Sequence, residues 1–269
     1  MNSLVYFNMK ALSISVVGVP ITAMPFDWQI SRICEWAQTS ASRVICLANT
    51  HMLVEATQNR QLMNIITNAD LVAPDGMPLV WMLRLLGARH QNRVAGLDVF
   101  ESIFQRSSEC NLGIYLVGSH PAILAKMQEK LADEYPAAPV VGIEPLPFSS
   151  SIECDQNLID RINASKAGIV FVSLGCPKQE KWMALHKGKI NAVMIGVGAV
   201  FPVYAGIHKR APQFLRTLGL EWLFRLAQEP LRLWKRYAYT IPIFLYRATL
   251  QLLHTSLSAP GEIQDQKSH

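Results

Sequence analysis

Short apolar runs rich in β-branched residues recur along the chain, and segments with helical periodicity separate them. Alternation of buried strands with helices indicates βαβ units around a mostly parallel sheet. The predicted fold is therefore α/β, a Rossmann-like and mostly parallel sheet flanked by helices. The expected strands cover residues 14–17, 44–47, 71–73, 112–117, 140–142, 169–172 and 192–195, and the clearest helices cover residues 26–37, 78–86, 121–135, 156–164 and 178–186.

Composition excludes several classes of protein. The chain has 269 residues and is 50% hydrophobic, which suffices for one large core, and no run of 18 uncharged apolar residues predicts a membrane-spanning helix. Its five cysteines are odd in number and form no C-x-x-C pair, so neither a disulfide framework nor a zinc site is expected. A reducing, cytoplasmic location follows.

Basic residues are concentrated near the carboxyl end, although the net charge of the whole chain is only +5. Residues 208–250 contain eight Lys and Arg against two Glu, which leaves the rest of the chain nearly neutral. We expect residues 1–218 to form the α/β domain, residues 219–257 a basic helical appendage, and residues 258–269 a disordered tail.

A helical projection of the appendage separates two kinds of side chain. At 100° per residue, one side gathers apolar residues from Leu223 to Ala248, and two prolines interrupt the phase. The arginines fall roughly opposite, and these are Arg225, Arg232, Arg236 and Arg247.

A polar segment directly follows the apolar run at residues 168–172. Its Gly-Cys-Pro turn opens a helix with Lys178, Gln179 and Glu180. The carboxyl end of a strand followed by free helix N–H groups is where open α/β sheets bind phosphorylated ligands. An ordinary, solvated first turn of a helix is the alternative.

Other polar residues also follow predicted strands. Asp75, in Pro-Asp-Gly, is placed to take a proton from a hydroxyl, although on spacing alone an Asp-Gly turn is favoured. Arg93 precedes a glycine turn and could meet a diphosphate, or lie on the surface. Asp98 with Glu101 predicts a capping box for a helix at residues 99–105. Asn49 and Gly118 are strand-end positions with the same ambiguity.

Three further patterns argue against particular chemistries. The G-x-G at Gly196 and Gly198 lacks the remainder of the dinucleotide fingerprint and its acidic partner, which disfavours a dinucleotide-dependent oxidoreductase. No Asp-x-Asp offers carboxylates to a metal-chelated nucleotide. Cys176 has no nearby base that marks it as a nucleophile.

Taken in order, these segments resemble the WecG/TagA/CpsF glycosyltransferases, known as glycosyltransferase family 26. The resemblance runs from about residue 18 to residue 237, and the ordered set is far more specific than any one segment. The matching residues are Asn49, Asp75, Arg93 to Asp98, Gly118, Gly175 to Glu180, Gly196 to Gly198, Lys209 to Pro212, Gly219 to Trp222, Arg225, Pro230 and Arg232.

This resemblance implies an inverting, metal-independent transfer of a sugar from a UDP-sugar to a polyprenyl-diphosphate-linked sugar, with no cofactor, in cell-surface or exopolysaccharide synthesis. It implies that Asp75 is the general base and that Arg93 and Gln179 belong to the substrate pocket. The donor could be N-acetylmannosamine, its uronic acid or glucose. The full set of expected substrate-binding residues is Asn49, Arg93, Asp98, Gly118, Lys178, Gln179, Glu180, Gly198 and Arg210.

The sequence departs from the family pattern at two positions. Leu47 stands where many relatives have threonine, and Pro202 stands in a segment where many have aspartate. If these side chains touch the donor, the protein uses a different sugar, or it is a catalytically impaired nucleotide-sugar-binding or regulatory protein.

The basic appendage predicts a membrane surface as a partner. Each Lys or Arg near an anionic leaflet contributes about 1 kcal/mol, so Arg225, Arg232 and Arg236 are expected to face the membrane and its lipid-linked acceptor. We therefore expect a protein that binds peripherally to the inner face of the cell membrane. A packed tail with solvated arginines is the alternative, and no motif for nucleic acid accompanies the charge. The oligomeric state, including a homo-oligomer, stays open.

Overall fold

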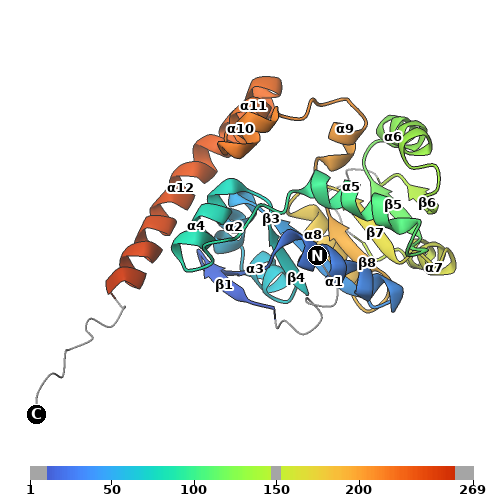
Figure 1. Cartoon of the computed structure of the whole chain (residues 1–269), viewed down its shortest axis with the longest axis horizontal. Helices are drawn as coiled ribbons and strands as arrows, with labels where there is room; N and C mark the ends of the chain where they lie inside the picture. The colour runs from blue at the N-terminus through green and yellow to red at the C-terminus, as the bar shows by residue number, and fades with distance from the viewer. Residues whose placement is uncertain (1–10, 147–152, 258–269) are drawn as a thin grey trace, which may run out of the picture.

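A computed structural model describes residues 11–146 and 153–257 (Figure 1). The expected disordered tail, residues 258–269, lies outside the described residues.

Six parallel strands form the central sheet, in the order β4-β3-β8-β7-β5-β6. Each predicted strand after the first overlaps one of these strands, so the α/β fold is confirmed. The bounds are β3 Arg43–Ala48, β4 Leu71–Pro74, β5 Ile114–Gly118, β6 Val140–Glu144, β7 Ile169–Ser173 and β8 Val193–Gly196.

The first predicted strand lies outside the main sheet. It is β1 (Ser13–Val16), which pairs antiparallel with β2 (Val19–Thr22) in a separate hairpin. Val17 and Gly18 form the two-residue turn with positive φ angles of 51° and 81°. Both angles positive is the turn geometry that suits the twist of a hairpin, and a pattern of buried runs gave no sign of it.

Helices cover both faces of the sheet (Figure 1). Side chains alternate along each strand, so Ile169 and Phe171 face one layer while Val170 and Val172 face the other. The first layer comprises α1 Phe26–Gln38, α5 Gly96–Ser107, α6 Pro121–Glu134 and α9 Val200–Tyr204. The second comprises α2 Thr50–Gln58, α3 Arg60–Thr67, α4 Met77–Leu85, α7 Gln156–Ala164 and α8 Lys178–His186.

Three helices form the carboxyl-terminal segment, which lies along one side of the body (Figure 1). They are α10 Gln213–Thr217, α11 Glu221–Gln228 and α12 Pro230–Leu257. The helix α12 packs on the body through Leu233, Phe244 and Ala248, all buried. Further along, the Gln251 side chain clamps the hairpin, because its Oε1 accepts from Val17 N at 2.7 Å and its Nε2 donates to Ser15 O at 2.6 Å.

None of the helices in the described ranges combines the length and the apolar character needed to cross a membrane.

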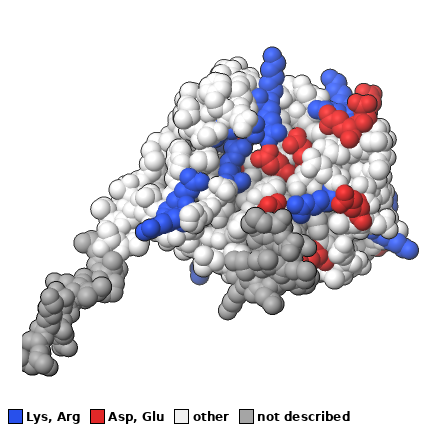
Figure 2. All heavy atoms as spheres, viewed as in Figure 1, with Lys and Arg blue, Asp and Glu red and all other residues white. Residues whose placement is uncertain are grey.

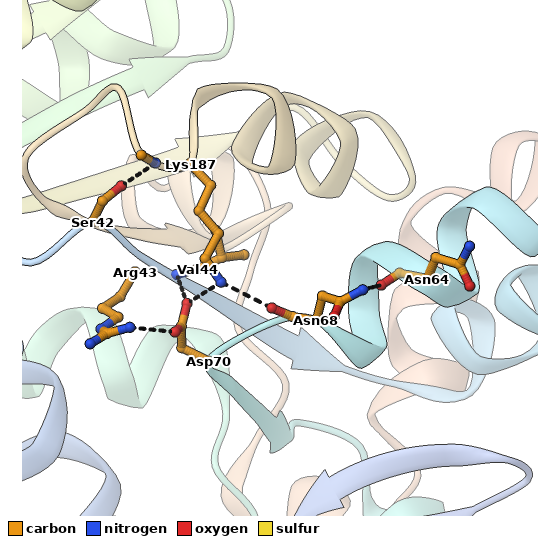
Figure 3. Close-up of polar contacts among 8 residues, drawn as sticks. Ser42, Arg43, Val44, Asn64, Asn68, Asp70 and Lys187 are labelled. Carbon is orange, nitrogen blue, oxygen red and sulfur yellow. Dashed lines mark hydrogen bonds and ion pairs between the residues drawn. The ribbon is translucent and has the colours of Figure 1, made fainter.

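Asp70 joins three segments at the amino ends of the strands (Figure 3). Its carboxylate accepts from Val44 N at 2.9 Å and from Arg43 Nη1 at 3.0 Å, and Lys187 Nζ lies 2.8 Å away. Lys187 also donates to Asn68 O at 3.0 Å. The starts of β3 and β4 are thus tied to the turn that follows α8, at the end of the sheet away from the carboxyl ends of the strands.

We expect Asp70→Ala to lower the free energy of unfolding by about 1–3 kcal/mol, because Val44 N loses its partner and Lys187 loses its anion. Arg43→Met is the matched control and should cost less than about 1 kcal/mol, since the Arg43 side chain is 41% exposed and a partly exposed ion pair contributes little. Urea denaturation followed by circular dichroism measures both. Equal losses for the two variants would contradict a special role for the carboxylate.

Candidate active site

A cavity of about 380 Å³ opens at the carboxyl ends of the strands. Residues that directly follow β3, β4, β5, β7 and β8 form one wall, because parallel strands end at a common edge. Helices α11 and α12 form the opposite wall. The strand-end residues are Asn49, Asp75, Ser119, Leu174 and Val197, and the helical residues include Arg225, Arg232, Arg236 and Tyr237.

Asp75 lies where this cavity meets a second one of about 70 Å³. Its Oδ1 accepts from Gly96 N at 3.1 Å. Burial and, after it, the nearby Glu221 charge raise the pKa of the Asp75 carboxyl, and Arg93, the Gly96 N–H and Arg225 oppose them, so that the pKa moves from 3.8 to about 6. A carboxyl with this pKa is mostly ionised above neutral pH and can accept a proton there.

Arg93 is held by an ion pair with the carboxyl-terminal segment. Its Nη1 lies 2.7 Å from Glu221 Oε2 on α11, and the pair lines the smaller cavity together with Asp75. Burial opposes the charged form of Arg93, but its hydrogen bond to Glu221 and that carboxylate's charge raise the pKa overall. The pair ties the loop before α5 to α11, directly beside Asp75.

The predicted capping box at Asp98 is wrong. Helix α5 begins at Gly96, three residues earlier than predicted, and its N-cap Ala95 offers no side-chain hydrogen bond. Asp98 instead lies in the first turn and pairs with Arg210, which also reaches Glu101 at 3.4 Å. Both carboxylates that the local pattern assigned to the end of the helix therefore pair with Arg210, a residue distant in sequence.

The α8 segment is buried rather than a solvated first turn. Gln179 is 3% exposed and Glu180 fully buried, and Gln179 lines the larger cavity. Cys176 also lines it, but burial and the Glu180 carboxylate raise the pKa of its thiol far above the usual range. Such a thiol stays protonated and is a poor nucleophile.

Three other predicted positions have local structural roles. Asn49 caps α2, with its Oδ1 accepting from Met52 N at 3.1 Å. Gly118 has a φ of +97°, and a Cβ there would lie 2.9 Å from Ser173 O, so a side chain does not fit. The Gly198 N–H donates to Gln179 Oε1 at 2.9 Å.

The helical projection of the appendage is wrong for its arginines. Arg225, Arg232 and Arg236 line the large cavity, whereas Leu223 and Trp234 of the supposed core side are about half exposed. The segment breaks into α11 and α12 at Glu229, so one continuous phase does not describe it. In Figure 2 basic side chains gather where this segment meets the body, beside acidic ones, while the outer edge of the segment is mostly uncharged on that face.

The predicted site residues thus fall into three groups. Asn49, Asp75, Gln179, Gly198 and the three arginines line the large cavity. Arg93 and Arg210 line the smaller one. Asp98, Gly118, Lys178 and Glu180 line neither of these two cavities and adjoin residues that do.

Sequence reasoning missed His51, which follows the Asn49 cap by two residues and lines the large cavity. Burial and the charge of Arg236 lower the pKa of its imidazole to about 4, so the ring is neutral at physiological pH. Its position just after a strand end was the available signal. Tyr237, which also lines the cavity, gave none, because its place depends on how α12 packs.

Within residues 11–146 and 153–257, no cluster of three or more His, Cys, Asp and Glu side chains could hold a metal ion.

Comparison with known proteins identifies the family. The model of the glycosyl transferase WecG/TagA/CpsF family matches residues 14–258. The chain belongs to this family. An N-acetylglucosaminyldiphosphoundecaprenol N-acetyl-β-D-mannosaminyltransferase of Bacillus spizizenii is 33% identical over 84% of this chain and 86% of its own. The protein of the same name from Bacillus subtilis is 32% identical over 74% of this chain and 78% of its own.

The resemblance inferred from the ordered motifs is therefore confirmed, and the protein is a glycosyltransferase of the WecG/TagA/CpsF family. Leu47 and Pro202, the two positions expected to differ from the family pattern, both line the large cavity. Leu47 is 4% exposed and contributes to the core as well as to the cavity wall.

The raised pKa of Asp75 predicts a stability effect that depends on pH. Because the folded protein holds the neutral acid more tightly than the unfolded chain, ionisation of Asp75 destabilises the fold as pH rises through about 6. We expect Asp75→Asn, which keeps an acceptor for Gly96 N, to be about 1–2 kcal/mol more stable than the wild type at pH 8. The advantage should shrink below pH 6 and vanish near pH 4.

Denaturant titrations at pH 4, 6 and 8 test this expectation. Asp160→Asn, at an exposed carboxyl on α7, is the control and should show no such trend. An Asp75→Asn protein that is less stable than the wild type at pH 8 would contradict the burial of an ionised carboxylate.

Proposed function

We propose that this protein transfers a sugar from a UDP-sugar to a polyprenyl-diphosphate-linked sugar, inverting the anomeric centre and using no metal ion. The observation that carries the proposal is that one cavity is lined both by the Asp75 carboxylate and by three arginines, Arg225, Arg232 and Arg236. The names of the two Bacillus relatives support an acceptor in which the sugar is linked through diphosphate to undecaprenol.

Asp75 is assigned as the general base. The acceptor hydroxyl gives its proton to the Asp75 carboxylate while its oxygen attacks the anomeric carbon of the donor. The bond from that carbon to the diphosphate oxygen breaks on the opposite face, and UDP leaves. A pKa near 6 suits this role, because the group is ionised at the working pH yet more basic than an ordinary carboxylate.

The arginines are assigned to the leaving diphosphate. Three guanidinium groups on one wall bring positive charge to the place where negative charge develops, and partial burial strengthens that interaction. Burial and the neighbouring Arg232 lower the pKa of Arg236, which is the direction expected where cations lie close together. A diphosphate would relieve this repulsion.

The smaller cavity offers an approach for the acceptor. Asp75 borders both cavities, so a hydroxyl entering from the smaller one could meet the carboxylate while the donor fills the larger one. This route places the acceptor beside Lys209 and the Arg93–Glu221 pair.

Choice of the donor sugar is assigned to the wall that contains Leu47 and Pro202. Neither side chain donates a hydrogen bond, so a sugar substituent at this wall meets an apolar surface. N-acetylmannosamine, its uronic acid and glucose are the donors to compare. The alternative, a nucleotide-sugar-binding protein with impaired catalysis, predicts binding of UDP-sugars without turnover on any lipid-linked acceptor.

Membrane attachment is assigned to exposed apolar side chains rather than to the cavity arginines. Leu231 is 90% exposed, and further large apolar residues of the carboxyl-terminal segment are exposed as well. Such a surface suits shallow insertion into the interface of a bilayer. With α4 it comprises Trp81, Leu85, Phe214, Leu218, Trp222, Leu223, Leu231, Trp234, Leu245, Tyr246, Leu250 and Leu253. The protein would thus act peripherally, on the cytoplasmic face.

Replacement of the base should abolish transfer without loss of the fold. We expect Asp75→Asn to lower kcat/KM by about 10²–10⁴-fold and to bind UDP normally. In the wild type, kcat/KM should fall as pH drops through about 6 and the carboxylate is protonated. Glu221→Gln should move that limb to lower pH, because the Glu221 charge raises the pKa of Asp75.

A UDP-release assay with each UDP-sugar and a lipid-diphosphate sugar, read by mass spectrometry, makes these measurements. Wild-type turnover by Asp75→Asn would refute the assignment of the base. UDP-sugar binding without any turnover by the wild type would favour the alternative.

Attachment should depend on the apolar surface. Leu231→Ser with Trp234→Ser should weaken binding to anionic phospholipid vesicles about tenfold or more, because two large side chains no longer insert. UDP binding should not change. Lys235→Gln, which removes the charge next to Trp234, is the control and should have a small, salt-dependent effect. Vesicle sedimentation measures this, and unchanged binding of the double variant would contradict the assignment.

A further inference from the structure

Glu180 is a fully buried carboxyl in the first turn of α8. No cation is paired with it among the described residues, and its Oε2 has no hydrogen-bond partner there. Burial raises the pKa of this carboxyl. An unpaired acid in a core costs stability that an apolar side chain of similar size would not. The presence of a carboxyl at this buried position therefore requires an explanation other than packing.

Glu180 interacts with two side chains, the Gln179 amide and the Cys176 thiol, and its hydrogen bond with Gln179 begins a chain of contacts that ends at the cavity wall. Gln179 Nε2 donates to Glu180 Oε1 at 2.8 Å, and Gln179 Oε1 accepts from Gly198 N at 2.9 Å. The Gly198 carbonyl in turn accepts from Ser173 Oγ at 2.6 Å. Three of these residues, Gln179, Gly198 and Ser173, line the large cavity.

These contacts select one orientation of the Gln179 amide. A flip by 180° would turn the NH₂ group toward the Gly198 N–H, placing donor against donor, and the amide oxygen toward the carboxyl. The space is also shaped around the amide, since a Cβ on Gly196 would lie 2.9 Å from Gln179 Nε2 and 2.8 Å from Met183 Cε.

We propose that Glu180 is a positioning residue that acts through Gln179. By accepting one of the two Nε2 hydrogens, it directs the amide so that Gly198 is held and the second hydrogen is offered to a ligand in the cavity. The ligand atoms expected there are diphosphate oxygens, because Gln179 lies in the first turn of α8, where a helix favours anions. This inference rests on the proposed function and assigns a task to a residue that lines neither cavity.

A double-mutant cycle on UDP binding tests the inference. Glu180→Gln keeps the shape but presents either an oxygen or an NH₂ group to Gln179, so the amide is no longer directed. We expect UDP to bind about tenfold more weakly to Glu180→Gln and to Gln179→Ala, roughly the effect of one charge-assisted hydrogen bond. The double variant should bind no more weakly than Gln179→Ala alone.

Calorimetry on the full chain makes the measurement, and thermal melting checks that each variant is folded. Wild-type affinity in Glu180→Gln, or losses that multiply in the double variant, would overturn the inference. A wild type that does not bind UDP would instead overturn the proposed function.

The wild-type protein provides a test that does not depend on a variant folding. In ¹⁵N NMR spectra, assigned with Gln179→Ala, a directed amide should give two Nε2 hydrogen signals that are shifted from the positions of a free glutamine and exchange slowly with solvent. UDP should shift one of the two far more than the other. A pair at the positions of a free glutamine, exchanging rapidly with solvent, would refute the directed amide.

Discussion

The parallel register of the central sheet is the constraint on which the site depends. Because Ala48 pairs with Pro74 and Gly118 with Ser173, the strands end level with one another, and the residues that follow must share one edge. The register continues beyond the strands, since Asp75 N donates to Ala48 O at 2.9 Å. Polar groups separated by more than a hundred residues in sequence therefore lie close together because of the strand register, without specific contacts between loops. One wall of the cavity is thus set by strand pairing alone.

The opposite wall is set by tertiary contacts of the carboxyl-terminal segment, and these contacts impose a compromise. Glu221 fixes α11 by pairing with Arg93, yet the same charge lies close enough to raise the pKa of Asp75. A base that is harder to ionise is also a stronger base, so the contact that closes the site adjusts its chemistry as well. Gln228 strengthens the closure, because its amide bonds both the N–H and the carbonyl of Lys209.

The features that depend on interactions between residues close in sequence could be predicted, and those that depend on tertiary contacts could not. Buried runs and helical periods are local signals, so six strands and the α/β class were predictable. The β1–β2 hairpin was not, because its turn needs positive φ angles at Val17 and Gly18 that the pattern of buried runs does not indicate. The partner of Asp98 and the direction of the three arginines were not, because they depend on how the carboxyl-terminal part of the chain packs on the body. Asp98 pairs with Arg210 and does not cap its helix. The three arginines lie on two helices, α11 and α12, which are separated at Glu229, so one helical projection does not describe their directions. Asp75 and Gln179 could be predicted as site residues because β4 and β7 end close to the positions that their local sequence predicts.

The carboxyl-terminal segment combines two properties that a simple basic stripe would keep on one face. Three of its arginines line the cavity, where a diphosphate would neutralise them, and many of its large apolar side chains are exposed. Truncation removes both at once, so loss of activity in a shortened chain would not by itself report on membrane binding. Point changes on the outer face separate the two, because Leu231 is almost fully exposed and lines neither cavity. The arrangement also explains why net charge is a poor guide to membrane binding: the arginines that line the cavity are withdrawn from the surface that we propose meets the lipid.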